Sequence, residues 1–154
     1  MTTTTSTGSG TGTTTRLAPG MVGGALGGVA GGMVFGMLMQ MMNVMPMIAQ
    51  LVGSQSIAVA WVVHLAVSAG LGATFGVLVA RGHLGVGSLT GLGVAYGVVW
   101  WVVGALLVMP AKLGMPVFHL DTMAWQSLMG HMMFGAILGI VTGAWLRRAS
   151  QTHA

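Results

Sequence analysis

The chain has 154 residues, of which 55% are hydrophobic and 4% are charged, with one acid, Asp121, and five basic residues. A water-soluble domain, in which roughly a quarter of the residues are charged, would not cover its surface with so few charges. The net charge of +4 does not indicate nucleic-acid binding, because the basic residues are scattered beside apolar stretches. The chain has no cysteine, which excludes disulfides and thiolate metal sites.

The first segment, residues 1–16, is a tail rich in threonine, serine and glycine. We expect it to be disordered, because it can bury little apolar surface to offset the entropy of ordering. It lacks the basic start of a secretory signal, so the apolar segment that follows should remain in the mature protein. The transmembrane domain then spans residues 17–148, and residues 149–154 form a short C-terminal tail.

Four nearly uncharged segments in this domain are long enough to cross a hydrocarbon core of about 30 Å as helices. Polar and breaker residues mark their ends: Asn43, Pro46 and the run 53–56 indicate the first loop, and Pro110 should end the third helix. The predicted helices are residues 21–42, 57–80, 88–109 and 123–146. The sequence therefore predicts an all-α fold, a polytopic membrane protein with a four-transmembrane-helix bundle.

Loop charges predict the orientation of this bundle in the lipid bilayer. Arg16, Arg81, Arg147 and Arg148 fall on one side of a four-span arrangement, and Lys112 falls on the other. Arginine and lysine are enriched in cytoplasmic loops. We therefore expect a multi-pass protein of the cell membrane with both termini in the cytoplasm.

Small residues at four-residue spacing run along all four predicted helices. Such Gly-xxx-Gly patterns let helix backbones approach closely in a membrane. The predicted packing glycines are Gly24, Gly28, Gly32, Gly36, Gly72, Gly76, Gly93, Gly97, Gly135, Gly139 and Gly143. The first helix also carries a second stripe at Gly23, Gly27 and Gly31, more small surface than one neighbour needs. This surplus indicates either a homo-oligomer or a helix buried centrally in its own bundle.

Two kinds of internal similarity suggest a duplicated helical hairpin. The Met-Pro pair at 45–46 and Trp61 are spaced like the pair at 109–110 and Trp125, which gives a repeat of about 64 residues. Separately, each helix carries an aromatic residue followed by glycine, with a small residue one turn earlier except at His131. The two registers do not align with each other, so a two-hairpin repeat is one of two open explanations.

Two histidines, His64 and His131, lie within the predicted spans at similar depth. Intramembrane ionisable residues are often functional. The pair can bind a metal ion, ligate a b-type haem or pass a proton. Alternatively, each imidazole donates a hydrogen bond to a carbonyl of a neighbouring helix and only holds the bundle together. His131 replaces the small residue of the aromatic-glycine motif, so we expect its loss to impair function more than the loss of His64.

Methionine is abundant, with fifteen residues in the chain. Met33, Met37, Met41 and Met45 form a ladder at helical spacing, and Met39, Met42 and Met47 lie nearby in the sequence. Thioethers are soft ligands that select Cu(I), so the ladder and the two histidines can form a copper path. The alternative is that methionine acts only as a flexible apolar filler between glycine-lined helices.

The second half of the chain resembles a known group of proteins. The stretch 96–110, with its paired tryptophans and Met-Pro end, and the segment 130–135, Gly-His-Met-Met-Phe-Gly, look like those of small, uncharacterised four-span membrane proteins of bacteria and archaea. The likeness covers the third and fourth helices well and the first half poorly. It implies the same topology and carries no activity.

The sequence leaves three hypotheses for function. No Ser-His-Asp, paired-carboxylate, nucleotide-binding or zinc-protease pattern occurs, so we do not expect an enzyme. The first hypothesis is a structural or accessory subunit that packs against itself or a larger membrane complex, without a cofactor. The second is a small transporter or channel, for example for Cu(I). The third is a b-haem protein that uses both intramembrane histidines.

Overall fold

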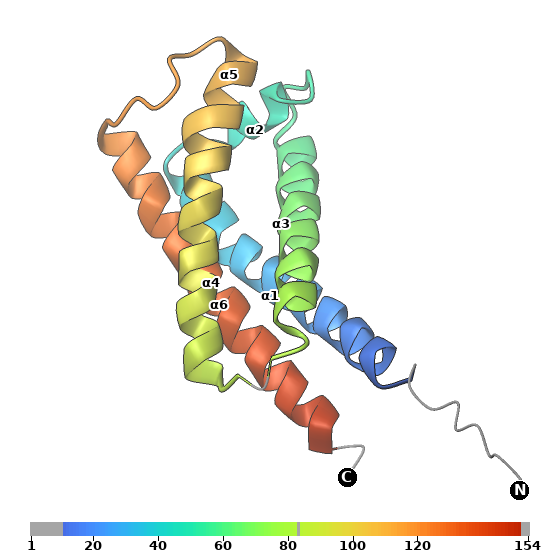
Figure 1. Cartoon of the computed structure of the whole chain (residues 1–154). Helices are drawn as coiled ribbons and strands as arrows, with labels where there is room; N and C mark the ends of the chain where they lie inside the picture. Colours follow the sequence, from blue (N-terminus) through green and yellow to red (C-terminus); the bar gives the residue numbers. More distant parts are fainter. Residues whose placement is uncertain (1–10, 83, 152–154) are drawn as a thin grey trace, which may run out of the picture.

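The structure, a computed structural model, describes residues 11–82 and 84–151, with side chains described from Leu17 onward. This part of the chain is helical and contains no strand. Its elements in order are α1 (Thr11–Met41), α2 (Met45–Gln50), α3 (Ile57–Val79), α4 (Val86–Trp100), the π-helix η1 (Trp101–Val108), α5 (Met109–Leu113) and α6 (Thr122–Gln151) (Figure 1).

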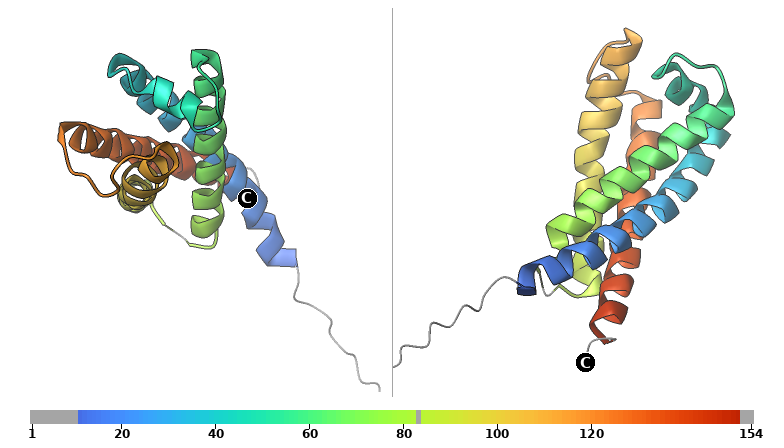
Figure 2. Two further views of the ribbon diagram at one scale, coloured as in Figure 1. Left: turned by 90° about the horizontal axis from the view of Figure 1, so that it is seen from above. Right: turned by 90° about the vertical axis from the view of Figure 1, so that its right-hand side faces the viewer.

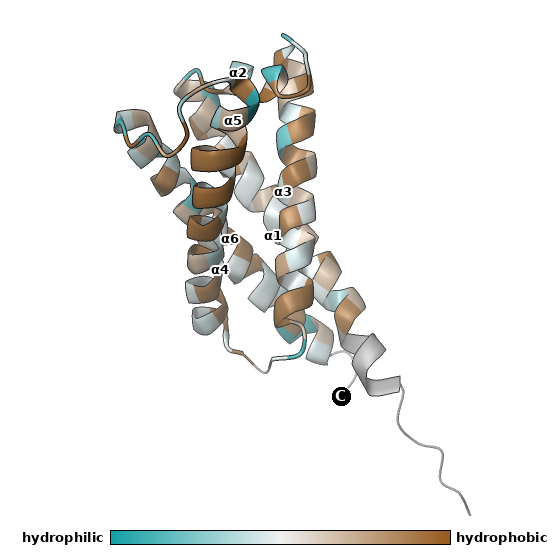
Figure 3. Ribbon diagram, turned by 45° about the horizontal axis from the view of Figure 1, so that its top comes forward, coloured by the Kyte–Doolittle hydropathy of each residue, from teal (hydrophilic) through white to brown (hydrophobic). Residues whose placement is uncertain are grey.

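Four segments of this part are long and apolar enough to cross a membrane. They are Leu17–Met41, Ile57–Val79, Val86–Leu113 and Thr122–Gln151. Most of η1 is hydrophobic, whereas polar residues gather at the loops (Figure 3). The predicted all-α fold, a bundle of four helices with the length and composition of membrane spans, is confirmed.

The ends of the chain are more helical than expected. α1 begins at Thr11, so residues 11–16 of the predicted disordered tail are helical. At the other end, α6 continues through 149–151, residues that the sequence predicts to be part of the C-terminal tail. Extending an existing helix adds one hydrogen bond for each residue fixed and avoids the cost of nucleation. Residues 1–10 and 152–154 lie outside the described part of the chain.

Asn43 ends α1 by adopting the left-handed conformation, with φ of 57°. Its own N–H donates to the carbonyl of Gln40, and the N–H of Val44 donates to the carbonyl of Met39. These two bonds form a Schellman motif, in which asparagine is a common substitute for glycine. The predicted loop at this position therefore has a local chemical cause.

The prediction that Pro110 ends the third helix is wrong. The helix passes through η1 and continues as α5 to Leu113. Proline has no N–H, so the carbonyl of Leu106, one helical turn earlier, is left without its usual donor. The N–H of Phe118 in the following connector donates to that carbonyl at 2.8 Å. The proline therefore does not break the helix, because the connector supplies the missing hydrogen bond.

The helices form two antiparallel pairs, α1 with α3 and α4 with α6, and each pair is held by backbone contact at glycine. A methyl group on Gly24 or Gly28 would collide with the backbone of α3 at Gly72 and Ser68. In the second pair, a methyl group on Gly93 or Gly97 would collide with the carbonyls of residues 135 and 131. All predicted packing glycines on α1, α3, α4 and α6 face another helix, although Gly32 and Gly36 would meet side chains of α3 and not its backbone.

These contacts bear on the two proposed repeat registers. Gly28 meets the carbonyl of Ser68 as Gly97 meets that of His131, and the pattern continues one turn along each pair. In this alignment His131 corresponds to Ser68, an offset of 63 residues, but Gly97 corresponds to Gly28, an offset of 69. Only the second helix of each pair therefore keeps the spacing of about 64 residues set by the Met-Pro pairs and tryptophans, and the choice between the two registers stays open. The aromatic-glycine motif would instead align His131 with Gly72, one helical turn away.

The second glycine stripe of α1 packs inside the bundle. A methyl group on Gly23 would strike Trp145, one on Gly27 would strike Leu138, and one on Gly31 would strike Phe134, all on α6. α1 therefore lies between α3 and α6 and joins the two pairs (Figure 2). Because both stripes are occupied within one chain, the surplus of glycine does not support a homo-oligomer.

Candidate functional site

The two pairs leave a pocket of about 410 Å³ at the end of the bundle that carries α2 and α5. α3 and α4 meet midway, where the hydroxyl of Tyr96 donates to the carbonyl of Leu71 and the rings of Tyr96 and Phe75 lie 5.3 Å apart. Beyond that point the two helices diverge (Figure 2, right). The pocket lies in the space between α3 and η1.

The lining is mostly apolar. Every helix contributes to it, although α4 contributes only its last residue, Trp100. Buried Phe35 and Phe134 line the pocket from the core of the bundle. η1 contributes one wall, and a Cβ atom added to Gly104 on that wall would meet no atom within 4 Å. π-helices occur frequently at functional sites. A concave apolar pocket with a few convergent polar groups is the usual form of a small-ligand site.

The connector between α5 and α6 borders the same pocket, to which it contributes Met115, Pro116, His119 and Asp121. Phe118 in this connector has φ of 54°, a conformation that is uncommon for a bulky residue. The hydrogen bond from its N–H to η1 holds it there. Asp121 Oδ1 accepts a hydrogen bond from the N–H of Ala124 at 2.8 Å and so caps α6. The structure shows no ion pair between Asp121 and Lys112.

His64 on α3 is buried and joins two helices. Its Nε2–H donates to the carbonyl of Gly32 on α1 at 2.9 Å, because a carbonyl can only accept. The neutral ring then leaves Nδ1 as an unprotonated acceptor. This hydrogen bond agrees with the interpretation that His64 holds α1 and α3 together. The imidazole of His64 also lines the pocket.

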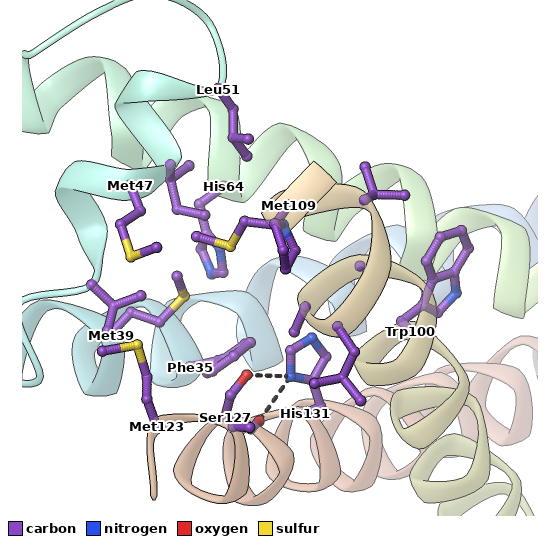
Figure 4. Close-up of a pocket in the computed structure, with 18 of the residues that line it drawn as sticks. Phe35, Met39, Met47, Leu51, His64, Trp100, Met109, Met123, Ser127 and His131 are labelled. Atoms are coloured by element: carbon purple, nitrogen blue, oxygen red, sulfur yellow. Dashed lines mark hydrogen bonds between the residues drawn. The ribbon is translucent and has the colours of Figure 1, made fainter. Parts of the chain in front are cut away.

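His131 on α6 is bonded differently. Its Nδ1–H donates to the carbonyl of Ser127, one turn earlier on the same helix, at 2.8 Å, and the Ser127 hydroxyl lies 3.4 Å away (Figure 4). This bond fixes the tautomer, so Nε2 carries a lone pair and no proton in the neutral ring. No hydrogen bond joins the imidazole to a neighbouring helix among the described residues. His131 therefore orients its ring without linking helices, unlike His64.

Phe35 contacts both imidazoles. Its ring centroid lies 5.7 Å from that of His64 and 4.7 Å from that of His131, in edge-on contact with both. A bis-histidine haem needs a flat macrocycle between two facing nitrogens. Here the buried ring of Phe35 packs against both imidazoles, and Nε2 of His64 already donates to α1. The arrangement does not fit a haem between His64 and His131.

The structure separates the methionines into two sets. Most of the predicted ladder faces outward, with exposed fractions of 37% for Met33, 53% for Met37 and 82% for Met41, and Met45 is buried in the core. None of these four lines the pocket. Six other methionines do, and they are Met39, Met42, Met47, Met109, Met115 and Met123. We define these six as the pocket methionines.

A sequence signal for part of this set was present. Met39 follows Phe35 by one helical turn, so it continues the face of α1 that contacts both histidines. The ladder follows a different face, one that contains exposed Met33 and Met37. Phe35, the aromatic residue of the aromatic-glycine motif, therefore indicates the pocket face of α1 better than the spacing of the methionines does.

No protein-family model matches the chain, and no curated protein or solved structure is significantly similar to it. The resemblance to small four-span proteins rests on the motifs alone, and the function must be argued from the pocket.

Proposed function

We propose that the protein is a membrane-embedded binding protein of the transporter class, which takes a small ligand into the pocket between α3 and η1. The observation that carries this proposal is the pocket itself, about 410 Å³ in volume and bordered by two imidazoles that each retain an unprotonated nitrogen. Ligand sites in helical membrane proteins commonly lie between helices in this way.

The pocket faces the outside of the cell in this proposal. The start of α1, the turn between α3 and α4 and the end of α6 lie at one end of the bundle (Figure 1). Arg16, Arg81 and Arg147 belong to these segments, and Lys112 belongs to the opposite end. The excess of arginine supports a cytoplasmic location for both termini in the cell membrane. The ligand would then enter from the external side, past the connector.

A carrier or receptor is better supported than an open channel. Phe35 and Phe134 are buried beneath the pocket, and the glycine contacts between α1 and α6 continue below them. A continuous pore would need a path through this tightly packed region. The ligand would therefore bind and leave on the same side, unless the two hairpins move relative to each other as the repeats of secondary transporters do.

The accessory-subunit hypothesis loses its main argument. It required free small-residue faces, and those of α1 are covered by α3 and α6. Assembly into a homo-oligomer or a larger membrane complex stays a prediction from sequence. The surface that would mediate it is not among the glycine stripes of α1.

Two adjacent residues on α3 test whether the pocket admits solutes. Val63 lines the pocket, whereas Val62 is 69% exposed on the outside of the bundle and does not line it. The chain has no cysteine, so Val63→Cys and Val62→Cys each provide a single thiol. We expect a membrane-impermeant maleimide added to intact cells to label residue 63 at least about tenfold faster than residue 62, because a thiol in lipid does not ionise.

Each alternative outcome of this labelling experiment has a definite meaning. Equal rates at the two positions would show that residue 63 is no more accessible to solutes than a residue on the outside of the bundle. Labelling of Val63→Cys only after the cells are permeabilised would show that the pocket opens to the cytoplasm. Either result would contradict the proposal as stated.

A further inference from the structure

The chemistry of the pocket lining is soft and almost uncharged. The six pocket methionines come from α1, α2, α5 and α6 and from the segments that join them. The lining contains no lysine or arginine, and its one carboxylate, Asp121, is the only acid in the chain. Figure 4 shows Met47, Met109 and His64 extending from three different helices toward the pocket. Such a lining offers neutral sulfur and nitrogen lone pairs with one negative charge at its edge.

Nε2 of His131 is the atom of this lining that is best oriented to bind a metal ion. Metal-binding histidines almost always donate their second ring N–H to a carbonyl, carboxylate or water, which fixes the tautomer and the ring orientation. The bond from His131 Nδ1–H to the Ser127 carbonyl is of this kind. It holds Nε2 unprotonated at the pocket without the help of another helix, so a cation binding there need not displace a proton.

We infer that the pocket binds a soft monovalent metal ion, Cu(I), through Nε2 of His131 and thioether sulfurs of the pocket methionines. This inference rests on the proposed function, because it names the ligand of the same pocket. Thioether and imidazole are ligands that Cu(I) accepts, and neither requires deprotonation here. The edge carboxylate of Asp121 favours a cation over an anion or a neutral solute.

The same lining argues against other metal ions. Calcium and magnesium require several oxygen ligands, and the lining offers few. No group of three or more His, Asp or Glu side chains suited to a metal ion occurs among the residues that the structure describes. Zinc normally takes three or four such ligands, so a zinc site is disfavoured as well. The thioether sulfurs of the pocket methionines therefore favour a soft ion such as Cu(I) over calcium, magnesium and zinc.

Titration of the purified protein in detergent with Cu(I), against a chromophoric Cu(I) chelator, tests this inference. We expect His131→Ala to weaken Cu(I) binding by at least about tenfold, the lower limit typical for disrupted metal sites. Met39→Leu/Met47→Leu/Met109→Leu should do the same, because it removes three sulfurs from three helices while conserving volume. Ag(I), which is soft and does not undergo redox change in air, should compete for the same site.

The matched control is Met33→Leu/Met37→Leu/Met41→Leu, which removes the same number of sulfurs from the outward face of α1. It should bind Cu(I) within about twofold of the unaltered protein. The inference is overturned if the unaltered protein binds no Cu(I), or if the outward triple weakens binding as much as the pocket triple does. A pocket that admits maleimide at Val63→Cys but binds no Cu(I) would overturn this inference and leave the proposed function intact.

Discussion

Replacing Gly72 with alanine is expected to destabilise the bundle, whereas the same change at Gly70, two residues earlier on α3, is expected to be neutral or stabilising. A Cβ atom at Gly72 would meet the backbone of α1 at Gly24 and Gly28, where no flexible side chain can move aside. A Cβ atom at Gly70 would meet nothing within 4 Å. The sign of the effect should therefore differ between two positions on one helix.

The magnitudes follow from overpacking and helix propensity. Forcing an extra methyl group into a packed interface costs about 1–3 kcal/mol, and alanine in place of glycine in an exposed helix gains up to about 1 kcal/mol. Reversible unfolding in mixed micelles, with denaturing detergent as the variable, would measure both free energies of unfolding. A second pair on α4, Gly93→Ala and Gly91→Ala, should behave in the same way. Equal effects within either pair would show that the backbones do not meet at these glycines.

The second large effect is expected at Gly104 in η1. Gly104→Phe should close the pocket without unfolding the protein, because the residue lines the pocket and its Cβ would meet no atom within 4 Å. The aromatic ring would then occupy space that a ligand needs. We expect labelling of Val63→Cys to slow by at least about tenfold and Cu(I) binding to fall by a similar factor, since an occupied pocket excludes both.

Gly91→Phe is the matched control for this substitution. Gly91 also has open space at its Cβ position but lies on α4 away from the pocket lining. The added ring should leave both labelling and Cu(I) binding unchanged, and both variants should unfold at similar denaturant concentrations. If Gly104→Phe leaves the pocket accessible, or if Gly91→Phe closes it as well, then η1 does not form a wall of the ligand site.

The sequence predicted the spans well because their apolar composition is a local property. It also identified the glycines at which helices meet, since small residues at four-residue spacing mark one face of a helix. It left open which helix each face would meet. The choice between a central α1 and an oligomer depended on whether α6 would cover Gly23, Gly27 and Gly31, and only the folded arrangement answers that question.

The candidate site was predicted in part. His64 and His131 border one pocket, but they differ in a way that spacing did not reveal, because one imidazole bonds across helices and the other bonds within its own. Most of the predicted methionine ladder lies on an outward face of α1, and none of its members lines the pocket. The regular spacing of Met33, Met37 and Met41 reflects the helical period, which is the same for a face toward lipid and a face toward the core.

The continuation of the third helix through Pro110 depended on tertiary structure. A proline inside an apolar helix normally signals its end or a kink. Here the carbonyl that it leaves free is bonded by Phe118, eight residues further along. No local pattern predicts that bond, because its donor lies in the connector that follows α5.

The most direct test of a soft-ligand pocket between the two hairpins is methyl NMR of the protein labelled with ¹³C-methyl methionine. Cu(I) is diamagnetic, so the methionine methyl signals can be followed during a titration and assigned by single Met→Leu variants. We predict that the signals that move will be those of pocket methionines, such as Met39, Met47 and Met109, and that those of Met33, Met37 and Met41 will stay in place. Movement confined to the outward set, or no movement at all, would contradict the account.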